Sequence, residues 1–500
     1  ESTETGDSTT PEAAIYLDQQ HGADDNDGLS KTTAVKTIEK ANELANEKNI
    51  NDICLSSFYK VTGTETWDLG GKTLHRYGLG GYMIELADAS ASLTLSNIVI
   101  DGAECTVDAA HAAETDSIIK AANGGTIVLN SGAILQNNKA AQFGSGILAN
   151  NRVNITMEDG AIIRNNTNRN YELGGGILIG NSSTFTMNGG EITRNKASSQ
   201  GGGVGVYRAA KFEMNNSASI TDNTANQGGG VYVDDKGVHK DGATFTMNNT
   251  ASVSGNTANQ GGVYVESGTF DMNDGTITGN TAKNEKASNN INGGGVYVSG
   301  GTFTMNGGAS SVSKNTAKNG GGVSVSSGTF NMNDGKISGN TGNGVFVHDN
   351  ATFTVSNTPT VTGNTITKNG AASNVFLTWG AKITIGTGGL NCDDGSIGVT
   401  KGAGRAGDAI ATGANKDYSG KFFVDDNKYK VGYDETHKQL VLAEKDTSAE
   451  THTHCLCGKT HTAIGDHKTD TQITFDTKLW MDNGVLKKGN GDWTKGTVNR

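Results

Sequence analysis

The residues best suited to chemistry lie near the end of the chain, where histidines and cysteines gather in one short segment. Cys455 and Cys457 stand two positions apart, with histidines before and after them. Thiolates and imidazoles at this density are the ligands that Zn²⁺ takes in closed tetrahedral sites. We expect a structural zinc site here; the alternative is a solvated linker that gathers metal only adventitiously. The expected ligands are Cys455, Cys457, His461 and either His467 or His454.

Two acidic side chains form a second candidate, because they interrupt a row that is otherwise mostly threonine. Glu213 and Asp271 occupy the third position of repeated T-F-x-M segments that lie two repeats apart. Strand spacing then separates them by about 10 Å, near the upper end for the carboxylate pair of an inverting glycoside hydrolase. Acidic residues on a solvated strand face are ordinary, however, and we favour that role over catalysis.

A row of tyrosines is the third candidate. Tyr232, Tyr264 and Tyr297 occupy the middle of repeated V-Y-V segments, so they should point away from the core. Outward rings stacked at a regular spacing can bind the flat faces of sugars. They can also cover a sheet and stabilise it by cross-strand contact, which is the role we favour.

The acidic turn at residues 24–28 has carboxylates at the i and i+2 spacing of a calcium loop. It lacks the distant glutamate of an EF-hand. We therefore do not expect calcium at this turn.

These candidates are positioned by a sequence phrase that recurs roughly every 23 to 33 residues. Each copy holds an apolar T-F-x-M segment, a G-x-I-x-x-N segment and a G-G-G-V-Y-V segment, with the period of two that strands require. One copy cannot bury its apolar face alone, whereas stacked copies can, so the repeat predicts a solenoid. The coil size is that of a parallel β-helix, for which right-handed winding is the default. The copies are centred on Phe185, Phe212, Phe245, Phe270, Phe303, Phe330 and Phe353.

The same alternation predicts which side chains fill the interior. Phenylalanine and methionine of T-F-x-M and the valines of V-Y-V should point inward, with the flanking threonines outward. One asparagine per coil occupies a common register, where stacked amides can hydrogen-bond from coil to coil. We interpret this ladder as structural; its members are Asn195, Asn223, Asn256, Asn280, Asn315, Asn340 and Asn364.

The predicted fold class is therefore all-β: a right-handed parallel β-helix solenoid with a short N-terminal capping helix and a small C-terminal appendage. Residues 30–46 show the periodicity of the capping helix, which would cover the open end of the stack. We divide the chain into a polar linker (1–13), an N-terminal cap (14–50), β-helix coils (51–390, regular from about 141), closing β coils (391–445) and a His/Cys-rich module with the start of a further segment (446–500).

Composition and charge narrow the class of protein. Glycine makes up 72 of the 500 residues and proline only 2, which suits many tight turns between paired strands. The net charge of −12 argues against nucleic acid as a partner, and no apolar run reaches the length of about 18 residues that spans a bilayer. Five cysteines do not form a disulfide framework. We expect Cys54, Cys105 and Cys392 to be small core hydrophobes.

Two features carry a resemblance to known proteins. Ile15-Tyr16-Leu17-Asp18, followed by Asn26-Asp27-Gly28-Leu29-Ser30 and Ala34-Val35-Lys36-Thr37-Ile38, resembles the N-terminal motif of pectate-lyase-like right-handed β-helix proteins. The G-G-G-V-Y-V and G-x-I-x-x-N-T-A repeats resemble adhesin-like repeat surface proteins of Gram-positive gut bacteria. The resemblance covers about residues 14 to 445 and implies an extracellular protein, on the cell surface or secreted. The polar start and the finish at Arg500 suggest a part of a longer surface protein.

The function that we expect is non-enzymatic binding or structural support. The β-helix would act as a rigid stalk or adhesive face for a glycan or for a host or microbial surface ligand. Ice binding is a minor alternative, because rows of threonine resemble the flat ladders of ice-binding solenoids. The main alternative is an extracellular polysaccharide lyase or glycoside hydrolase with its site in the irregular early coils. The chemically able residues there are Asp68, Arg76, Tyr77, Asp101, Glu104, His111 and Arg164.

Overall fold

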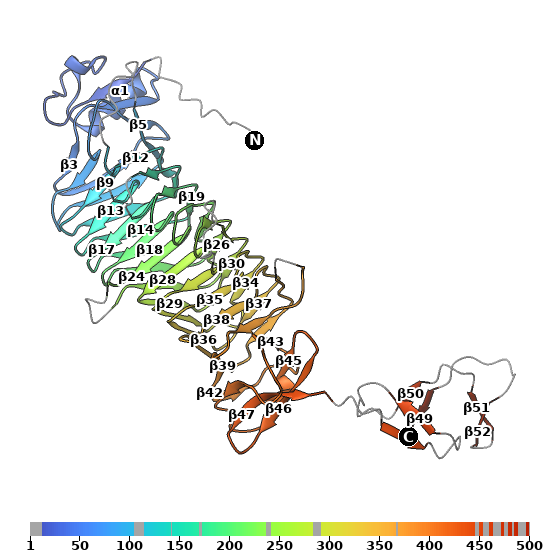
Figure 1. Cartoon of the computed structure of the whole chain (residues 1–500). Helices are drawn as coiled ribbons and strands as arrows, with labels where there is room; N and C mark the ends of the chain where they lie inside the picture. The colour runs from blue at the N-terminus through green and yellow to red at the C-terminus, as the bar shows by residue number, and fades with distance from the viewer. Residues whose placement is uncertain are drawn as a thin grey trace. The chain divides into compact units, whose positions relative to one another are not determined.

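The computed structural model describes residues 13–104, 115–141, 143–169, 173–236, 242–283, 292–366 and 369–445, together with the backbone of six short strands beyond residue 449. The chain divides into two compact units, residues 1–443 and 444–500, which are considered separately. In the first unit, successive coils stack along one axis. Their strands pair in parallel with strands of the coils before and after them (Figure 1).

The first strand of each regular coil carries the T-F-x-M segment, and neighbouring copies pair residue for residue. Phe212 lies opposite Phe245, and Met214 lies opposite Met247. These side chains are buried while the residues between them face outward, as predicted. We call this row the Phe strands. It comprises β4 (Thr64–Asp68), β7 (Ser92–Ser96), β10 (Thr126–Leu129), β14 (Asn154–Met157), β18 (Thr184–Met187), β22 (Lys211–Met214), β25 (Thr244–Met247), β29 (Thr269–Met272), β33 (Thr302–Met305), β36 (Thr329–Met332), β39 (Thr352–Asn357) and β42 (Ile383–Leu390).

The second strand of each coil carries the isoleucine or valine of the G-x-I-x-x-N segment, and we call this row the Ile strands. It begins with the strand of the N-terminal motif, and its central apolar residues stack, as Ile220 does on Val253. The row comprises β1 (Ile15–Leu17), β2 (Asp52–Leu55), β5 (Thr73–Arg76), β8 (Ile98–Glu104), β11 (Ala133–Gln136), β15 (Ile162–Arg164), β19 (Glu191–Thr193), β23 (Ser219–Thr221), β26 (Ser252–Ser254), β30 (Thr276–Thr278), β34 (Ser311–Ser313), β37 (Lys336–Ser338) and β40 (Thr360–Thr362).

A corner of two residues leads from five of the Ile strands to a very short strand, and a glycine-rich turn then leads to the third strand. The short strands are β12 (Lys139–Ala140), β16 (Thr167–Asn168), β20 (Lys196–Ala197), β27 (Thr257–Ala258) and β31 (Thr281–Ala282). The third row, which we call the Val strands, comprises β3 (Tyr59–Val61), β6 (Ile84–Leu86), β9 (Ile119–Ala121), β13 (Ile147–Asn150), β17 (Ile177–Gly180), β21 (Val204–Tyr207), β24 (Val231–Asp234), β28 (Val263–Ser267), β32 (Val296–Val298), β35 (Val323–Val325), β38 (Val345–Val347) and β41 (Val375–Leu377).

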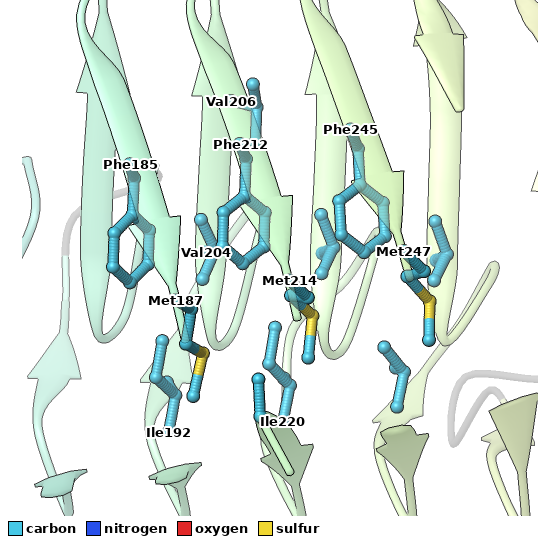
Figure 2. Close-up of a cluster of buried hydrophobic side chains, with 14 of the residues drawn as sticks. Phe185, Met187, Ile192, Val204, Val206, Phe212, Met214, Ile220, Phe245 and Met247 are labelled. Atoms are coloured by element: carbon cyan, nitrogen blue, oxygen red, sulfur yellow. The ribbon is translucent and has the colours of Figure 1, made fainter. Parts of the chain in front are cut away.

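The three rows enclose one continuous apolar column. Successive phenylalanines from Phe185 to Phe353 stack with ring centroids 4.6–5.0 Å apart and nearly parallel planes. Figure 2 shows Phe185, Phe212 and Phe245 in register, with the methionines in a second column beside them. All of these side chains are fully or almost fully buried. The column is the feature that stacking of the repeat was predicted to produce, and it is confirmed.

The buried asparagine ladder is also confirmed, and it is longer than predicted. In the middle coils the backbone N–H and the Nδ2 of each asparagine both donate to the Oδ1 of the next, as from Asn256 to Asn280 at 3.0 Å. The Nδ2 group also donates to a backbone carbonyl of the preceding coil. The ladder runs through Asn138, Asn166, Asn195, Asn223, Asn256, Asn280, Asn315, Asn340, Asn364 and Asn374.

Charged side chains close both ends of this ladder. At one end, the guanidinium of Arg76 donates to Asn138 Oδ1 at 3.2 Å. At the other end, Asp425 accepts from the backbone N–H of Asn374 at 2.8 Å and from its Nδ2 at 2.6 Å. Because every amide donates toward the C-terminal end, a donor-only group fits the first position and an acceptor-only group fits the last.

The N-terminal cap differs from its prediction in where the helix begins. Helix α1 spans Ile38–Glu47, and Thr37 caps it by accepting from the Lys40 N–H. The predicted helix began at residue 30. Val35 is instead extended, because it exchanges backbone hydrogen bonds with Tyr16 and Asp18 beside β1. The helix buries the stripe Ile38, Ala41, Leu44 and Ala45, as predicted.

Two smaller expectations for the early coils are wrong. The Asp101-Gly102 pair reads in the sequence as a turn, but β8 continues through both residues. Cys54 is not an isolated thiol, because it is disulfide-bonded. Cys392 is free and buried, as expected, and Cys105 lies outside the described residues.

The closing strands end the parallel stack. They are β43 (Ile397–Lys401), β44 (Ala409–Thr412), β45 (Phe422–Val424), β46 (Tyr429–Asp434) and β47 (Gln439–Glu444), all within the region 391–445 that was predicted to close the stack. The pairing of β47 with β44 is antiparallel, which stops the parallel ladder at this end. In the second unit, antiparallel pairs join β48 (Glu450–Thr453) to β49 (Thr460–Ala463), β50 (Gln472–Thr474) to β53 (Thr497–Asn499), and β51 (Leu479–Asp482) to β52 (Val485–Lys488).

Candidate functional site

The outer face of the Phe strands is a flat polar surface, which we call the threonine face. Its side chains are the first and third residues of each T-F-x-M segment. Thr246 lies directly between Glu213 and Asp271 in the strand register, so the two carboxylates are two coils apart, as expected. The threonine pattern is interrupted at these two positions and also at Lys211 and Asn331.

The two carboxylates of the threonine face have different surroundings. Glu213 is exposed and accepts a hydrogen bond from Asn248 Nδ2 at 3.0 Å. Asp271 is partly buried, and that burial raises its pKa, while the Thr304 side chain offsets part of the effect. No hydrogen bond links the two carboxylates within the part of the chain that the structure describes.

An outer asparagine row borders the threonine face. Each side-chain amide donates to the side-chain oxygen of the asparagine one coil earlier, as from Asn273 to Asn248 at 2.9 Å. The first member, Asn188, donates to Glu158 at 2.9 Å. The row therefore presents fixed amide groups beside fixed hydroxyl groups over several coils. Its members are Asn188, Asn215, Asn248, Asn273, Asn306 and Asn333.

The tyrosine row points away from the column but is not exposed, which corrects the expectation of outward rings in solvent. Tyr232, Tyr264 and Tyr297 are 0 %, 4 % and 7 % exposed and pack in a separate cluster with Tyr207. Their ring centroids lie 5.4 Å and 5.0 Å apart. Burial raises the pKa of Tyr232 and of Tyr264. The rings thus cover the sheet, the role favoured from the sequence, and present little surface to a sugar.

A buried carboxylate sits beside this cluster. Asp234 Oδ2 accepts from the Tyr232 hydroxyl at 3.2 Å and lies 3.1 Å from Lys236 Nζ. Its Oδ1 accepts from Ser267 Oγ at 2.7 Å. Burial acts to raise the pKa of Asp234, but the hydrogen bonds from Lys236 and Ser267 outweigh it and hold the pKa below its ordinary value.

The early coils carry a polar chain on the outer face of the Ile strands. His75 Nε2 lies 2.7 Å from Asp52 Oδ1, and the next coil places Asp101 opposite His75. Asp101 Oδ2 accepts from Gln136 Nε2 at 2.9 Å, and Gln136 Oε1 accepts from Arg164 Nε at 2.8 Å. Carboxylate, imidazole and guanidinium groups therefore follow one another across consecutive coils, and side chains of the first two kinds can act as general acids or bases when they lie within hydrogen-bond reach of a reacting group.

The other early-coil candidates are not gathered at this chain. Arg76 is fully buried and donates to backbone carbonyls of Leu79, Gly81 and Gly102 as well as to the ladder. Asp68 binds Asn97 and the Gly70 N–H, and Tyr77 packs edge-on against Tyr16. His111 and the side chain of Glu104 lie outside the described residues. His75 and Asp52 were not among the candidates named from the sequence. Only the strand register brings them together, and their spacing in the sequence gives no sign of it.

The acidic turn at residues 24–28 uses its side chains to hold the cap. Asp24 Oδ1 accepts from the backbone N–H groups of Lys36 and Thr37, each at 2.9 Å. Asp27 Oδ1 accepts from the Leu29 N–H at 3.0 Å. These contacts give the turn a structural role.

The proposed zinc ligands belong to the segment that follows the closing strands. Cys455, Cys457, His454 and His467 lie outside the described residues, and only the backbone of His461 is described, in β49. Among residues whose side chains are described, no group of three or more His, Cys, Asp or Glu side chains could hold a metal ion.

Comparison with known proteins bears on the fold. A family described as "Right handed beta helix region" matches residues 210–389, which hold most of the regular coils. The fold is a right-handed parallel β-helix. No curated protein and no solved structure matches the chain. Among the described residues, no helix has the length and apolar character to cross a bilayer.

Proposed function

We propose that this β-helix is an exported, non-enzymatic binding protein, adhesin-like in its repeats, which attaches to a glycan or to a host or microbial surface through its outer faces. The observation that carries the proposal is the regularity of those faces. The outer asparagine row repeats one side-chain contact over six residues, from Asn188 to Asn333. Such a surface is already ordered before binding, so little conformational entropy is lost when a ligand makes many weak polar contacts.

Export is supported by the cysteine chemistry of the early coils. The disulfide at Cys54 suits an oxidising compartment, because thiols in the cytosol are generally kept reduced. A surface location agrees with the resemblance to repeat surface proteins. The predicted association with a longer surface protein belongs to the same proposal.

The test is a glycan-array screen paired with an assay for release of reducing ends from mucin and pectin. We expect binding to a subset of glycans without turnover. Turnover that is abolished by Glu213→Gln or Asp271→Asn would contradict a non-enzymatic role. Absence of binding to every glycan and every surface extract would contradict the binding role.

An extracellular polysaccharide lyase or glycoside hydrolase is the second candidate, and the polar chain of the early coils favours it. His75 and Asp101 lie in neighbouring strands, and Arg164 is joined to them through Gln136. If this chain is catalytic, His75→Ala should abolish reducing-end release while Asp271→Asn leaves it unchanged. Loss of reducing-end release in both variants would show that the polar chain of the early coils is not the catalytic site by itself.

The His/Cys-rich segment remains a proposed structural zinc site. Elemental analysis after dialysis should give about one zinc per chain, because four Cys and His ligands close a tetrahedral site. A variant with both Cys455 and Cys457 replaced by serine should contain none, whereas Cys392→Ser should retain the metal. Zinc that is lost on dialysis of the native chain would contradict the proposal.

A further inference from the structure

Five cations gather at one corner of the β-helix, where three consecutive coils turn from the Ile strands toward the glycine-rich turns. Four of their side chains are exposed and that of Arg164 is partly exposed. The whole chain has a net charge of −12, so this corner reverses the prevailing sign. We call it the basic corner, and it consists of Lys139, Arg164, Arg169, Arg194 and Lys196.

The strand register places these residues side by side. Lys139 and Lys196 occupy the same position in β12 and β20, with Thr167 of β16 between them. Arg164 ends β15, directly opposite Thr193 of the next coil. Three coils at the strand spacing of about 4.8 Å give the corner a length of about 10 Å along the axis.

The backbone of the corner turns these side chains away from the core. Asn137, Asn165 and Arg194 occupy equivalent positions in the three coils and have left-handed backbone angles, with φ of 61°, 56° and 53°. The next residue in each coil is a buried member of the asparagine ladder. Because side chains alternate along the chain, the following residue, Lys139 or Lys196, faces outward again.

The cations are densest in these three coils, and later coils carry only single lysines at other positions of the corner, namely Lys283, Lys314 and Lys318. In the six coils that follow, the position of Lys139 and Lys196 is always threonine. Asp222 follows Arg194 at the equivalent position of the next coil and marks the end of the corner. None of the five cations forms an ion pair with a carboxylate among the described residues. The threonines concerned are Thr224, Thr257, Thr281, Thr316, Thr341 and Thr365.

We infer that the basic corner binds an anionic glycan, through carboxylate or sulfate groups on successive sugars. Arginine offers a planar pair of donors that fits either group, and lysine adds a compact charge. Arg164 is partly exposed, and its one described hydrogen bond uses Nε, which donates to Gln136, so its two terminal nitrogens have no described partner. This inference rests on the proposed glycan-binding function and assigns it a site and a ligand class.

A narrow polymer fits this surface better than a large flat one. The basic corner spans only three coils, and the net charge of −12 on the whole chain disfavours an extended anionic partner such as a membrane or a nucleic acid duplex. Hydroxyl and amide groups of Thr167, Asn137 and Asn165 lie among the cations and can bind sugar hydroxyls. A single glycan chain running along the basic corner uses both kinds of contact.

The experiment compares two double variants of the full chain that remove the same charge. Lys139→Thr with Lys196→Thr changes the basic corner, using the residue that the same position carries in later coils. Lys336→Thr with Lys416→Thr is the matched control, since both lysines are exposed and lie outside the basic corner and the threonine face. Arg164→Thr and Arg194→Asn extend the first variant, because Thr193 and Asn165 occupy the equivalent positions.

The probes are polygalacturonate, which carries carboxylates, heparin, which carries sulfates, and neutral dextran. We expect binding to one or both anionic polymers, weakened about threefold in the corner double variant and about tenfold with all four changes. The control variant should retain native affinity, and added salt should weaken binding. The polymer whose affinity falls in the corner variants shows whether the basic corner binds carboxylate or sulfate groups.

Three outcomes would overturn the inference. Equal weakening in both double variants would show a general charge effect, and equal binding of duplex DNA would show a patch that does not select sugars. If the chain bound only dextran, with the same affinity in all variants, the basic corner would be excluded as the binding site. The proposed glycan-binding function would still stand. Failure to bind any glycan on the array would remove that function as well.

Discussion

Asp234 and Asp271 lie on different faces of the coil and show how far the surroundings of one residue decide its chemistry. Hydrogen bonds from Lys236 and Ser267 stabilise the charged form of Asp234 and lower its pKa despite its burial. Burial of Asp271 dominates its single hydroxyl contact, so its pKa is raised. The two groups should therefore change stability with pH in opposite directions.

The sign follows from the ordinary aspartate pKa of about 3.9 in the unfolded chain. Stabilisation by Asp234 is present above that value and is lost as pH falls through its lowered folded pKa. The contribution of Asp271 is present below that value and is lost as pH rises through its raised folded pKa. We compare the melting temperature of each variant with that of the native chain at the same pH. For Asp234→Asn the difference should become more negative as pH rises from 2 to about 4. For Asp271→Asn the difference should become more positive as pH rises above about 4. Calorimetry of both variants across this range measures the effect, and parallel curves for the two variants would contradict it.

Single residues were predictable from the sequence where strand alternation alone decides their position. Phe270 and Met272 are buried and Thr269 faces outward because side chains alternate across the sheet. Alternation also turns Tyr264 outward, but it cannot tell that neighbouring tyrosines and turns cover the ring. Burial on the outer side depends on how the coils meet, which no local pattern records.

The buried asparagine ladder is the element that joins coils most directly. Asn256 Oδ1 accepts from both the N–H and the Nδ2 of Asn223, and its own Nδ2 donates to Ile220, Ser254 and Asn280. All of its side-chain hydrogen-bonding capacity is thus used without water. Loss of one member leaves buried donors and acceptors on two neighbouring coils without partners.

Asn256→Ala should therefore destabilise the chain by about 3 kcal/mol or more, since each buried polar group left unpaired costs about 1–3 kcal/mol. Asn259→Ala is the matched control. Asn259 lies three residues later, and its side chain pairs with Asn226 at an exposed position. Its removal should change the free energy of unfolding by no more than about 0.5 kcal/mol. Urea unfolding of both variants gives the comparison, and similar losses would argue against a special role for the buried ladder.

At the scale of elements, the sequence was most informative inside the repeat and least informative at its ends. Strands of the regular coils follow from apolar period and turn residues, whereas the start of α1 depends on a tertiary contact. Val35 could continue a helix by its periodicity, but pairing with β1 holds it extended. The disulfide at Cys54 was likewise not predicted, because cysteine spacing alone does not give connectivity.

The buried asparagine ladder ends at two charged groups that lie many coils apart. Arg76 supplies donors to the first asparagine of the ladder, and Asp425 supplies acceptors to the last. Thr400 also donates to Asp425 at 2.8 Å. The closing strands therefore do more than cover apolar side chains, because they also complete the hydrogen bonding of the final coil.

Asp425→Ala should open the C-terminal end of the stack. It leaves the N–H and Nδ2 of Asn374 without acceptors, at a cost of about 2 kcal/mol or more. Hydrogen exchange should rise in β43 and β45 while the coils around β22 keep their protection. Asp426→Ala, at an exposed neighbouring position, is the control and should leave exchange unchanged. Uniformly faster exchange along the chain would show that the group acts on global stability rather than on the end.

Matching positions in successive coils also make the coils interchangeable. The contacts that Phe245 makes with Phe212 and Phe270 are nearly the same as those that Phe303 makes with Phe270 and Phe330. A genetic recombination that deletes or duplicates one whole turn would thus join surfaces that already fit. Lineages carrying such a gene can lengthen or shorten the rod without redesigning its interior, while the end groups and the basic corner stay as they are.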